Sequence, residues 1–160
     1  MSGNFIVPVN NLYIAQYYKS TNQNGASGTT NITFDLTQPW NNIGGYVSHI
    51  DGSTDFTINK SGLYQVEFAL LVFGNGATWV SQKQASINIV RGINNAILQQ
   101  STTVPSNNGY GIQVTGTLYL VAGDIIRCLN VGGLTSGNVS IQGLANTFDF
   151  NTTFTWTFIN

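Results

Sequence analysis

The residue best suited to acid–base chemistry in this sequence is His49, the only histidine among 160 residues. A Ser-His-Asp triad built on it would need an orienting carboxylate, which Asp51 or Asp55 could supply, and a serine nucleophile. No Gly-x-Ser-x-Gly segment marks such a serine. Neither a Walker phosphate loop nor the paired glycines of a dinucleotide site is present. The sequence therefore predicts a protein that is not an enzyme and has no cofactor, with His49 in a surface turn.

The same two carboxylates, Asp51 and Asp55, are the candidates for a metal site, because they could share a loop with backbone carbonyl groups. The loop lacks the dense carboxylates of a calcium site, so we predict no metal ion. Cys128 is the single cysteine and lies in the apolar run Ile125 to Val131. An intrachain disulfide is therefore excluded, and we expect a buried, unreactive thiol.

Charged residues make up only 7% of the chain, and its net charge is −1. The five cations are spread thinly along the sequence, so no basic patch is available for nucleic acid. The longest apolar stretch, Phe68 to Phe73, is far shorter than the roughly 20 residues that span a bilayer. No signal peptide is visible in the first ten residues. From these features we predict that the protein binds no nucleic acid and does not insert into a membrane.

Apolar residues recur in short segments rich in Val, Ile, Thr, Tyr and Phe, separated by Gly, Asn and Ser. This pattern predicts strands and leaves no window for a helix. About ten strands are expected: Leu12 to Tyr18, Asn31 to Leu36, Asp55 to Ile58, Leu63 to Phe73, Ala85 to Val90, Ala96 to Thr103, Tyr110 to Val121, Ile125 to Val131, Val139 to Leu144 and Thr152 to Ile159. We predict one all-β domain over residues 1–160, a sandwich of two packed antiparallel sheets, with 1–11 as a short N-terminal arm.

Three blocks in chain order resemble the tumour-necrosis-factor (TNF) and complement-one-q head superfamily. The first runs from Phe56 to Phe68 and contains Gly62-Leu-Tyr64-Gln-Val66-Glu-Phe68. The second, Gly116 to Ile126, contains the turn Gly123-Asp124, and the third is Phe154-Thr-Trp-Thr-Phe158-Ile159. Ile32-Thr-Phe34-Asp35 is similar to the family's short second strand. The resemblance covers most of the chain and implies a TNF-like jelly roll.

The resemblance also implies a homotrimer, because members of this superfamily meet through one sheet face at a threefold axis. Carried over by position, it places six side chains at the interface: Phe154, Trp156, Phe158, Gln113, Gln65 and Glu67. Trp156 departs from the family, which usually has a small residue there. Burying the charged Glu67 at a threefold axis without water would be energetically unfavourable unless its carboxylate were hydrogen-bonded or near a solvated end of the axis.

Asn-rich and Gly-rich loops supply the candidate ligand contacts, which are Trp79, Tyr110, Asn107 and Asn108. Amides and aromatic rings of this kind suit sugars or proteins. The leading interpretation is a trimeric surface protein of a virus or phage, such as a capsid spike, vertex, fibre head or decoration protein, that contacts a receptor or glycan and other capsid or fibre proteins. The alternative is a secreted cytokine-like or lectin-like head. The expected location is the virion or the extracellular surface.

Overall fold

The computed structural model describes residues 13–19, 21–25, 28–37, 43, 45–79, 83–103, 109–132, 134–141, 143 and 152–159. No helix occurs within these ranges, and so none there is long and apolar enough to cross a membrane. Thirteen strands are described: β1 Tyr13–Tyr18, β2 Gln23–Gly25, β3 Gly28–Asn31, β4 Leu36–Thr37, β5 Val47–His49, β6 Phe56–Ile58, β7 Gly62–Trp79, β8 Lys83–Arg91, β9 Asn94–Thr103, β10 Gly109–Leu120, β11 Ile125–Gly132, β12 Leu134–Ile141 and β13 Thr153–Phe158. The predicted all-β class is confirmed. The predicted N-terminal arm lies outside the described residues.

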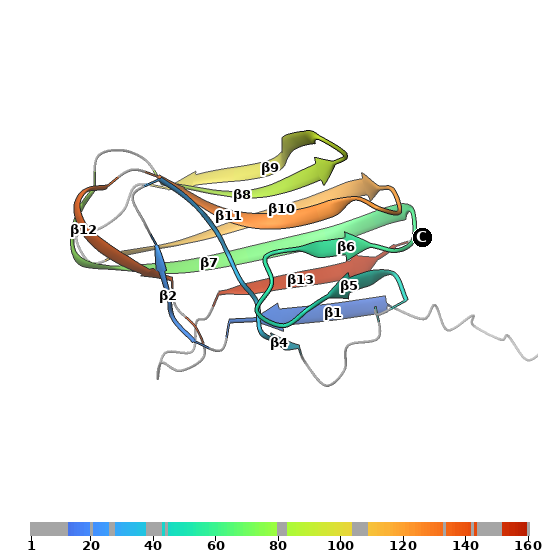
Figure 1. Cartoon of the computed structure of the whole chain (residues 1–160), viewed down its shortest axis with the longest axis horizontal. Helices are drawn as coiled ribbons and strands as arrows, with labels where there is room; N and C mark the ends of the chain where they lie inside the picture. The colour runs from blue at the N-terminus through green and yellow to red at the C-terminus, as the bar shows by residue number, and fades with distance from the viewer. Residues whose placement is uncertain are drawn as a thin grey trace, which may run out of the picture.

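The strands form two antiparallel sheets packed face to face (Figure 1). Sheet A has the order β2-β12-β7-β13-β1-β4, with β10 on the other side of β7. Sheet B has the order β5-β6-β11-β8-β9, with β3 also paired to β11. The segment expected as one strand from Asn31 to Leu36 is divided between β3, an isolated bridge of Phe34 to Ser53, and β4. Apart from such local differences, the predicted sandwich is the observed architecture.

Strand β7 is the centre of sheet A. It pairs with β10 along one side, and with β13 and then β12 along the other. Its alternation of apolar and polar residues sends Tyr64, Val66 and Phe68 into the core and leaves Gln65 and Glu67 exposed. A Cβ atom on Gly62 would lie 2.5 Å from Phe158 Cε2, so the start of β7 requires glycine for close packing.

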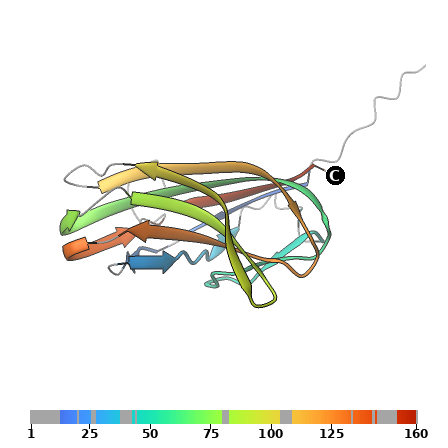
Figure 2. The same cartoon turned by 90° about the horizontal axis from the view of Figure 1, so that it is seen from above.

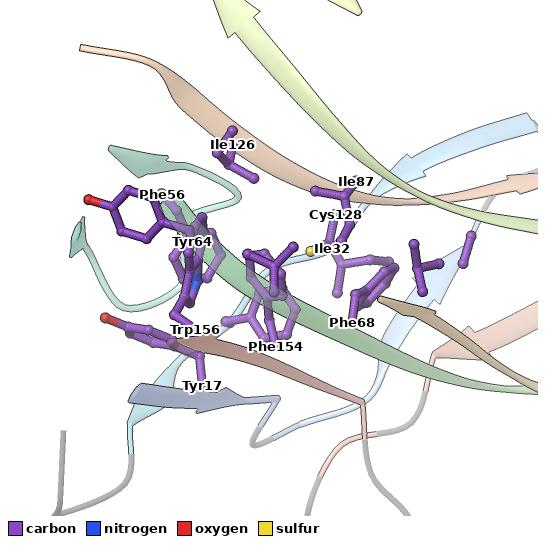
Figure 3. Close-up of a cluster of buried hydrophobic side chains, with 14 of the residues drawn as sticks. Tyr17, Ile32, Phe56, Tyr64, Phe68, Ile87, Ile126, Cys128, Phe154 and Trp156 are labelled. Carbon is purple, nitrogen blue, oxygen red and sulfur yellow. The ribbon is translucent and has the colours of Figure 1, made fainter. Parts of the chain in front are cut away.

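The aromatic face of β13 lies inside the sandwich, between the two sheets (Figure 3). Trp156 and Phe154 are fully buried, and their ring centroids lie 5.8 Å and 5.0 Å from that of Phe56 on sheet B. Phe158 packs 5.1 Å from Tyr64. The expectation that these three β13 side chains face a threefold axis is therefore wrong. Phe56 of sheet B covers Phe154 and Trp156, and Tyr46 in the turn before β5 covers Phe158, so these side chains need no second copy to leave water.

Several titratable side chains are buried in the structure. Cys128 is fully buried, as predicted, and burial raises the pKa of its thiol. Lys19 Nζ donates hydrogen bonds to Thr33 Oγ1 (2.8 Å) and to the Thr33 carbonyl (3.1 Å). Desolvation lowers the pKa of Lys19 and also that of Lys83 at the start of β8. Two of the five cations are thus used inside the fold rather than on its surface.

Candidate functional site

His49 is engaged on both sides of its ring. Nδ1 lies 2.9 Å from the carbonyl oxygen of Asp55, and Nε2 lies 2.8 Å from that of Phe34. The ring also stacks on Phe56, with centroids 4.2 Å apart. His49 is therefore a half-buried residue of β5 and not the surface turn residue we expected. Because both nitrogens face carbonyl groups, neither is free to accept a proton from a serine.

The carboxylate of Asp55 forms a two-point ion pair with Arg127. Its oxygens accept hydrogen bonds from Arg127 Nε (2.6 Å) and Nη2 (2.9 Å). Asp51 is exposed in the turn after β5. Among the described residues, no three His, Cys, Asp or Glu side chains come close enough to hold a metal ion. The Asp55 carboxylate is thus paired with Arg127 of β11 and is not available to bind a metal ion.

Asp124 closes the turn between β10 and β11 and also fixes the end of β8. Its Oδ2 accepts from the Val121 amide (2.8 Å), and its two oxygens accept from Arg91 Nε (2.6 Å) and Nη2 (2.5 Å). Gly123 has φ of +95°, which glycine adopts at little cost. Arg91 is 56% exposed whereas the Asp124 side chain is almost fully buried. The role of Asp124 is structural, as the sequence predicted.

These two ion pairs predict acid sensitivity. Hydrogen bonds from Arg127 and Arg91 hold the pKa values of Asp55 and Asp124 below the usual range. Their stabilising contribution is complete above the unfolded value of about 4 and is lost as pH falls through the lowered folded values. Thermal unfolding should show a midpoint lower by about 5 °C or more at pH 3 than at pH 6.

Two variants locate the source of this acid sensitivity. Arg127→Gln removes one pair, so it should melt below the wild type at pH 6 and close to it at pH 3. Asp51→Asn changes an exposed carboxylate and should keep the full wild-type loss. An Arg127→Gln protein with an unchanged pH dependence would show that the Asp55 pair is not responsible.

The predicted ligand-binding residues are not brought together by the structure. Tyr110 is buried in β10, and its hydroxyl donates to Asn130 Oδ1. Burial raises the pKa of this phenol well above its usual value. The prediction that Tyr110 contacts a ligand is therefore wrong. Trp79 ends β7 and its side chain is not described, while Asn107 and Asn108 lie outside the described residues.

The outer face of sheet A, which points away from sheet B, is the first candidate surface. It contains the other three predicted interface residues, Gln65, Glu67 and Gln113, all exposed in the free chain. A hollow of about 470 Å³ in this face is lined by Glu67, Ala69, Leu70, Leu71, Gly111, Ile112 and Gln113. The remaining outward residues nearby are mostly threonines: Thr115, Thr117, Thr153, Thr155 and Thr157. Glu67 is the only charged residue of β1, β7, β10 and β13.

The second candidate surface lies along the neighbouring edge of the sandwich, where β9 and β10 run close together. We call it the edge patch: its exposed residues are Ile97 on β9 (53% exposed) and Tyr119 on β10 (69%), and Leu98 on β9 is partly buried. A cleft of about 300 Å³ is lined by Ile89, Arg91, Asn94, Ala96, Leu98 and Tyr119. Seen from above, the β8–β9 hairpin extends past the other strands (Figure 2), and Ile93 at its tip is fully exposed.

Ile93 and Tyr119 are surface residues that were not predicted, although the sequence carries a signal for each. Ile93 follows Gly92, whose φ of +59° suits a tight hairpin turn, and no core position is available at such a tip. Tyr119 alternates with Leu118 and Leu120, which are both buried. Period-two counting along β10 therefore places Tyr119 on the outward side.

Comparison with known proteins places this fold. No family model matches the sequence, and no curated protein is similar to it in sequence. Among solved structures, murine APRIL at pH 8.5 superposes with a TM-score of 0.63 at 9% identity, covering 92% of this chain and 99% of that chain. Murine APRIL at pH 5.0 gives 0.62 at 11% identity, covering 91% and 98%. The Eiger TNF structure from S. frugiperda gives 0.56 at 12% identity, with 93% of each chain covered.

The sheet order and these superpositions define the class of fold as a two-sheet antiparallel jelly roll. More particularly, the chain has the TNF-like jelly-roll fold, and the resemblance read from the three sequence blocks is confirmed at the level of fold. At 9–12% identity the similarity concerns the fold alone.

Proposed function

We propose that this chain is a non-enzymatic binding head that acts as a homotrimer, with the outer face of sheet A as its self-association surface. The observation that carries the proposal is the character of that face. It is broad, almost without charge, and hollowed over Gly111, where β10 itself has no side chain and Leu71 of β7 lies beside the gap. The TNF-like fold supports the same assembly, because the resemblance implies contact through this sheet.

Two surfaces of different shape favour a ring over a dimer. The hollow lies in the outer face of sheet A, whereas Ile97, 53% exposed, projects from β9 at the edge of sheet B. A contact between unlike surfaces is heterologous, so each copy offers one surface to each neighbour, and a closed ring satisfies both. Burying such apolar side chains stabilises the contact by about 25 cal/mol per Å² removed from water. We therefore place the edge patch of one copy against the hollow of the next.

The solution mass tests this proposal. Light scattering during size-exclusion chromatography, at about 10 µM protein, should give about three times the chain mass of 17.3 kDa. A mass of one chain, or of two, at that concentration would contradict the homotrimer.

The hairpin tip is the proposed contact for a partner. Ile93 is fully exposed, and the Arg91–Asp124 pair anchors the base of the hairpin to the β10–β11 turn. A rigid, exposed apolar side chain can fill a pocket on a receptor at low entropic cost. The polar Asn94 and Asn95 beside it offer amide groups for hydrogen bonds to a protein or a glycan.

Ile93→Asp tests the tip directly. The variant should keep the wild-type solution mass and melting temperature, because Ile93 has no neighbours to lose. Its binding to a ligand found on a glycan array or a panel of receptor ectodomains should fall by about tenfold or more. Ile50→Asp is the matched control, since Ile50 is also an exposed isoleucine in a turn. Equal binding by wild type and Ile93→Asp would show that the hairpin tip does not contact the partner.

The cytokine-like head is favoured over the particle-surface protein. The TNF-like fold favours a cytokine-like binding head, whereas the virus or phage interpretation rests on features of the sequence alone. Release of the protein into the medium would agree with the first, and copurification with particles with the second. The non-enzymatic assignment is supported by the engaged ring nitrogens of His49. His49→Ala should therefore leave partner binding intact in a folded protein.

A further inference from the structure

We propose that self-association of this chain takes up protons at Glu67, so that the assembly is stronger at mildly acidic pH than at neutral pH. The inference rests on the proposed homotrimer and concerns the regulation of the same surface. On this proposal, the charge of Glu67 weakens self-association at neutral pH.

Glu67 lies at the centre of the face that the neighbouring copy would cover. In register it sits between Thr155 on β13 and Thr115 on β10. It also lines the hollow, together with Gln113. Its side chain is exposed in the free chain, so water solvates the carboxylate there. A second copy seated in the hollow would remove that water.

No described group on this face compensates the charge. The side chains that face outward around Glu67 are Thr153, Thr155 and Thr157 on β13, Gln113, Thr115, Thr117 and Tyr119 on β10, Gln65 on β7, and Ile14, Gln16 and Tyr18 on β1. Apart from the aliphatic Ile14 they carry hydroxyl or amide groups, and β1, β7, β10 and β13 contain no lysine, arginine or histidine. Neither described ion pair includes Glu67.

The surface that would cover Glu67 also has few groups that could neutralise its charge. Arg91 is the one cation lining the cleft of the edge patch. Its guanidinium already donates to both oxygens of Asp124 in its own chain. Pairing it with Glu67 of another copy would break the contact that holds the hairpin. The incoming surface otherwise offers only neutral donors, the amide of Asn94 and the hydroxyl of Tyr119, which do not neutralise a carboxylate.

The coupling between proton binding and association then sets the direction of the pH effect. Burying an unpaired carboxylate is much more costly than burying a carboxylic acid. The assembled form therefore binds protons more tightly than the free chain, and three Glu67 side chains are covered in each trimer. A process that takes up protons becomes more favourable as pH falls.

Sedimentation equilibrium of the full chain at pH 5.0 and pH 7.5 measures this effect. We expect the association constant of the wild type to be about tenfold or more higher at pH 5.0. Glu67→Gln keeps the shape without the charge, so it should associate more tightly than the wild type at pH 7.5 and equally at both pH values. Asp51→Asn removes an exposed carboxylate in the turn after β5 and should keep the wild-type difference. Glu67→Ala is a second variant with the same expectation as Glu67→Gln.

Different outcomes separate this inference from the homotrimer itself. A wild-type trimer whose association constant is equal at the two pH values, or lower at pH 5.0, overturns the proton uptake and leaves the homotrimer intact. Glu67 variants that keep the wild-type pH dependence overturn it as well. Wild type and Glu67→Gln that are monomeric at both pH values contradict the homotrimer, and with it this inference.

Discussion

Replacing Trp156 with alanine is expected to lower the free energy of unfolding by about 3–5 kcal/mol. The side chain is fully buried at the centre of the aromatic cluster, in contact with Phe56, Tyr64 and Phe154. Its removal leaves a cavity that rigid neighbouring rings cannot collapse to fill. Because a domain of this size is stable by about 5–15 kcal/mol, the loss is a large part of the total. Urea unfolding followed by tryptophan fluorescence and circular dichroism measures it.

Thr155→Ala is the matched control on the same strand. Thr155 faces the opposite side of β13, so its truncation should cost about 1 kcal/mol or less. All proteins are compared at one chain concentration, since association contributes to apparent stability. If Trp156→Ala were as stable as Thr155→Ala and differed from the wild type only in solution mass, the side chain would belong to an interface between copies. That result would reverse the assignment of the aromatic face to the core.

The fold could be predicted from the sequence because its signals are local. Alternation in Leu63 to Phe68 identifies a strand with one buried side, and Gly62 and Gly123 stand where close packing and a positive φ require them. The faces of β13 were harder to assign. The sequence shows that Phe154 and Trp156 share one side and Thr155 the other, but a buried aromatic face can be covered by the second sheet or by a second copy. Only the position of β13 opposite β6 decides between them.

The candidate surfaces could be predicted only in part, for a related reason. Gln65, Glu67 and Gln113 lie on the outer face as expected, because the parity of β7 and β10 can be counted from their buried residues. Tyr110 was misplaced because it was assigned to a loop, whereas it has the same parity as buried Ile112 and Val114. The edge patch depends on how two strands from different sheets approach each other. Such an arrangement leaves no trace in the spacing of residues along either strand.

Charge in this chain is used mainly to hold the fold together. Arg91 and Arg127 pair with Asp124 and Asp55, and Lys19 is hydrogen-bonded inside the structure. Large surfaces are consequently left with threonine, glutamine and scattered apolar groups. Such surfaces have few like charges to keep copies apart, so a low charge content favours association. On the outer face of sheet A, Glu67 is the exception, which is why its removal is informative.

Ala69→Glu is expected to abolish self-association without unfolding the chain. Ala69 points into the hollow from β7, two residues from Glu67 and opposite Gln113 on β10. The new side chain fills the space that the neighbouring copy needs and places a second carboxylate in a face without cations. Each hollow would then hold two carboxylates covered by the neighbouring copy, and like charges desolvated at close range cost several kcal/mol. Light scattering at about 10 µM should therefore give the mass of one chain.

The outward position of Ala69 makes the result interpretable. In the free chain the glutamate can extend into water, so far-UV circular dichroism should match that of the wild type. Thr57→Glu places the same charge on β6, facing away from the core on sheet B, and should leave the solution mass of the wild type unchanged. Loss of assembly in both variants would implicate net charge rather than the hollow. Assembly retained by Ala69→Glu would mean that the copies meet through another surface, because no neighbour could occupy the hollow beside two uncompensated carboxylates.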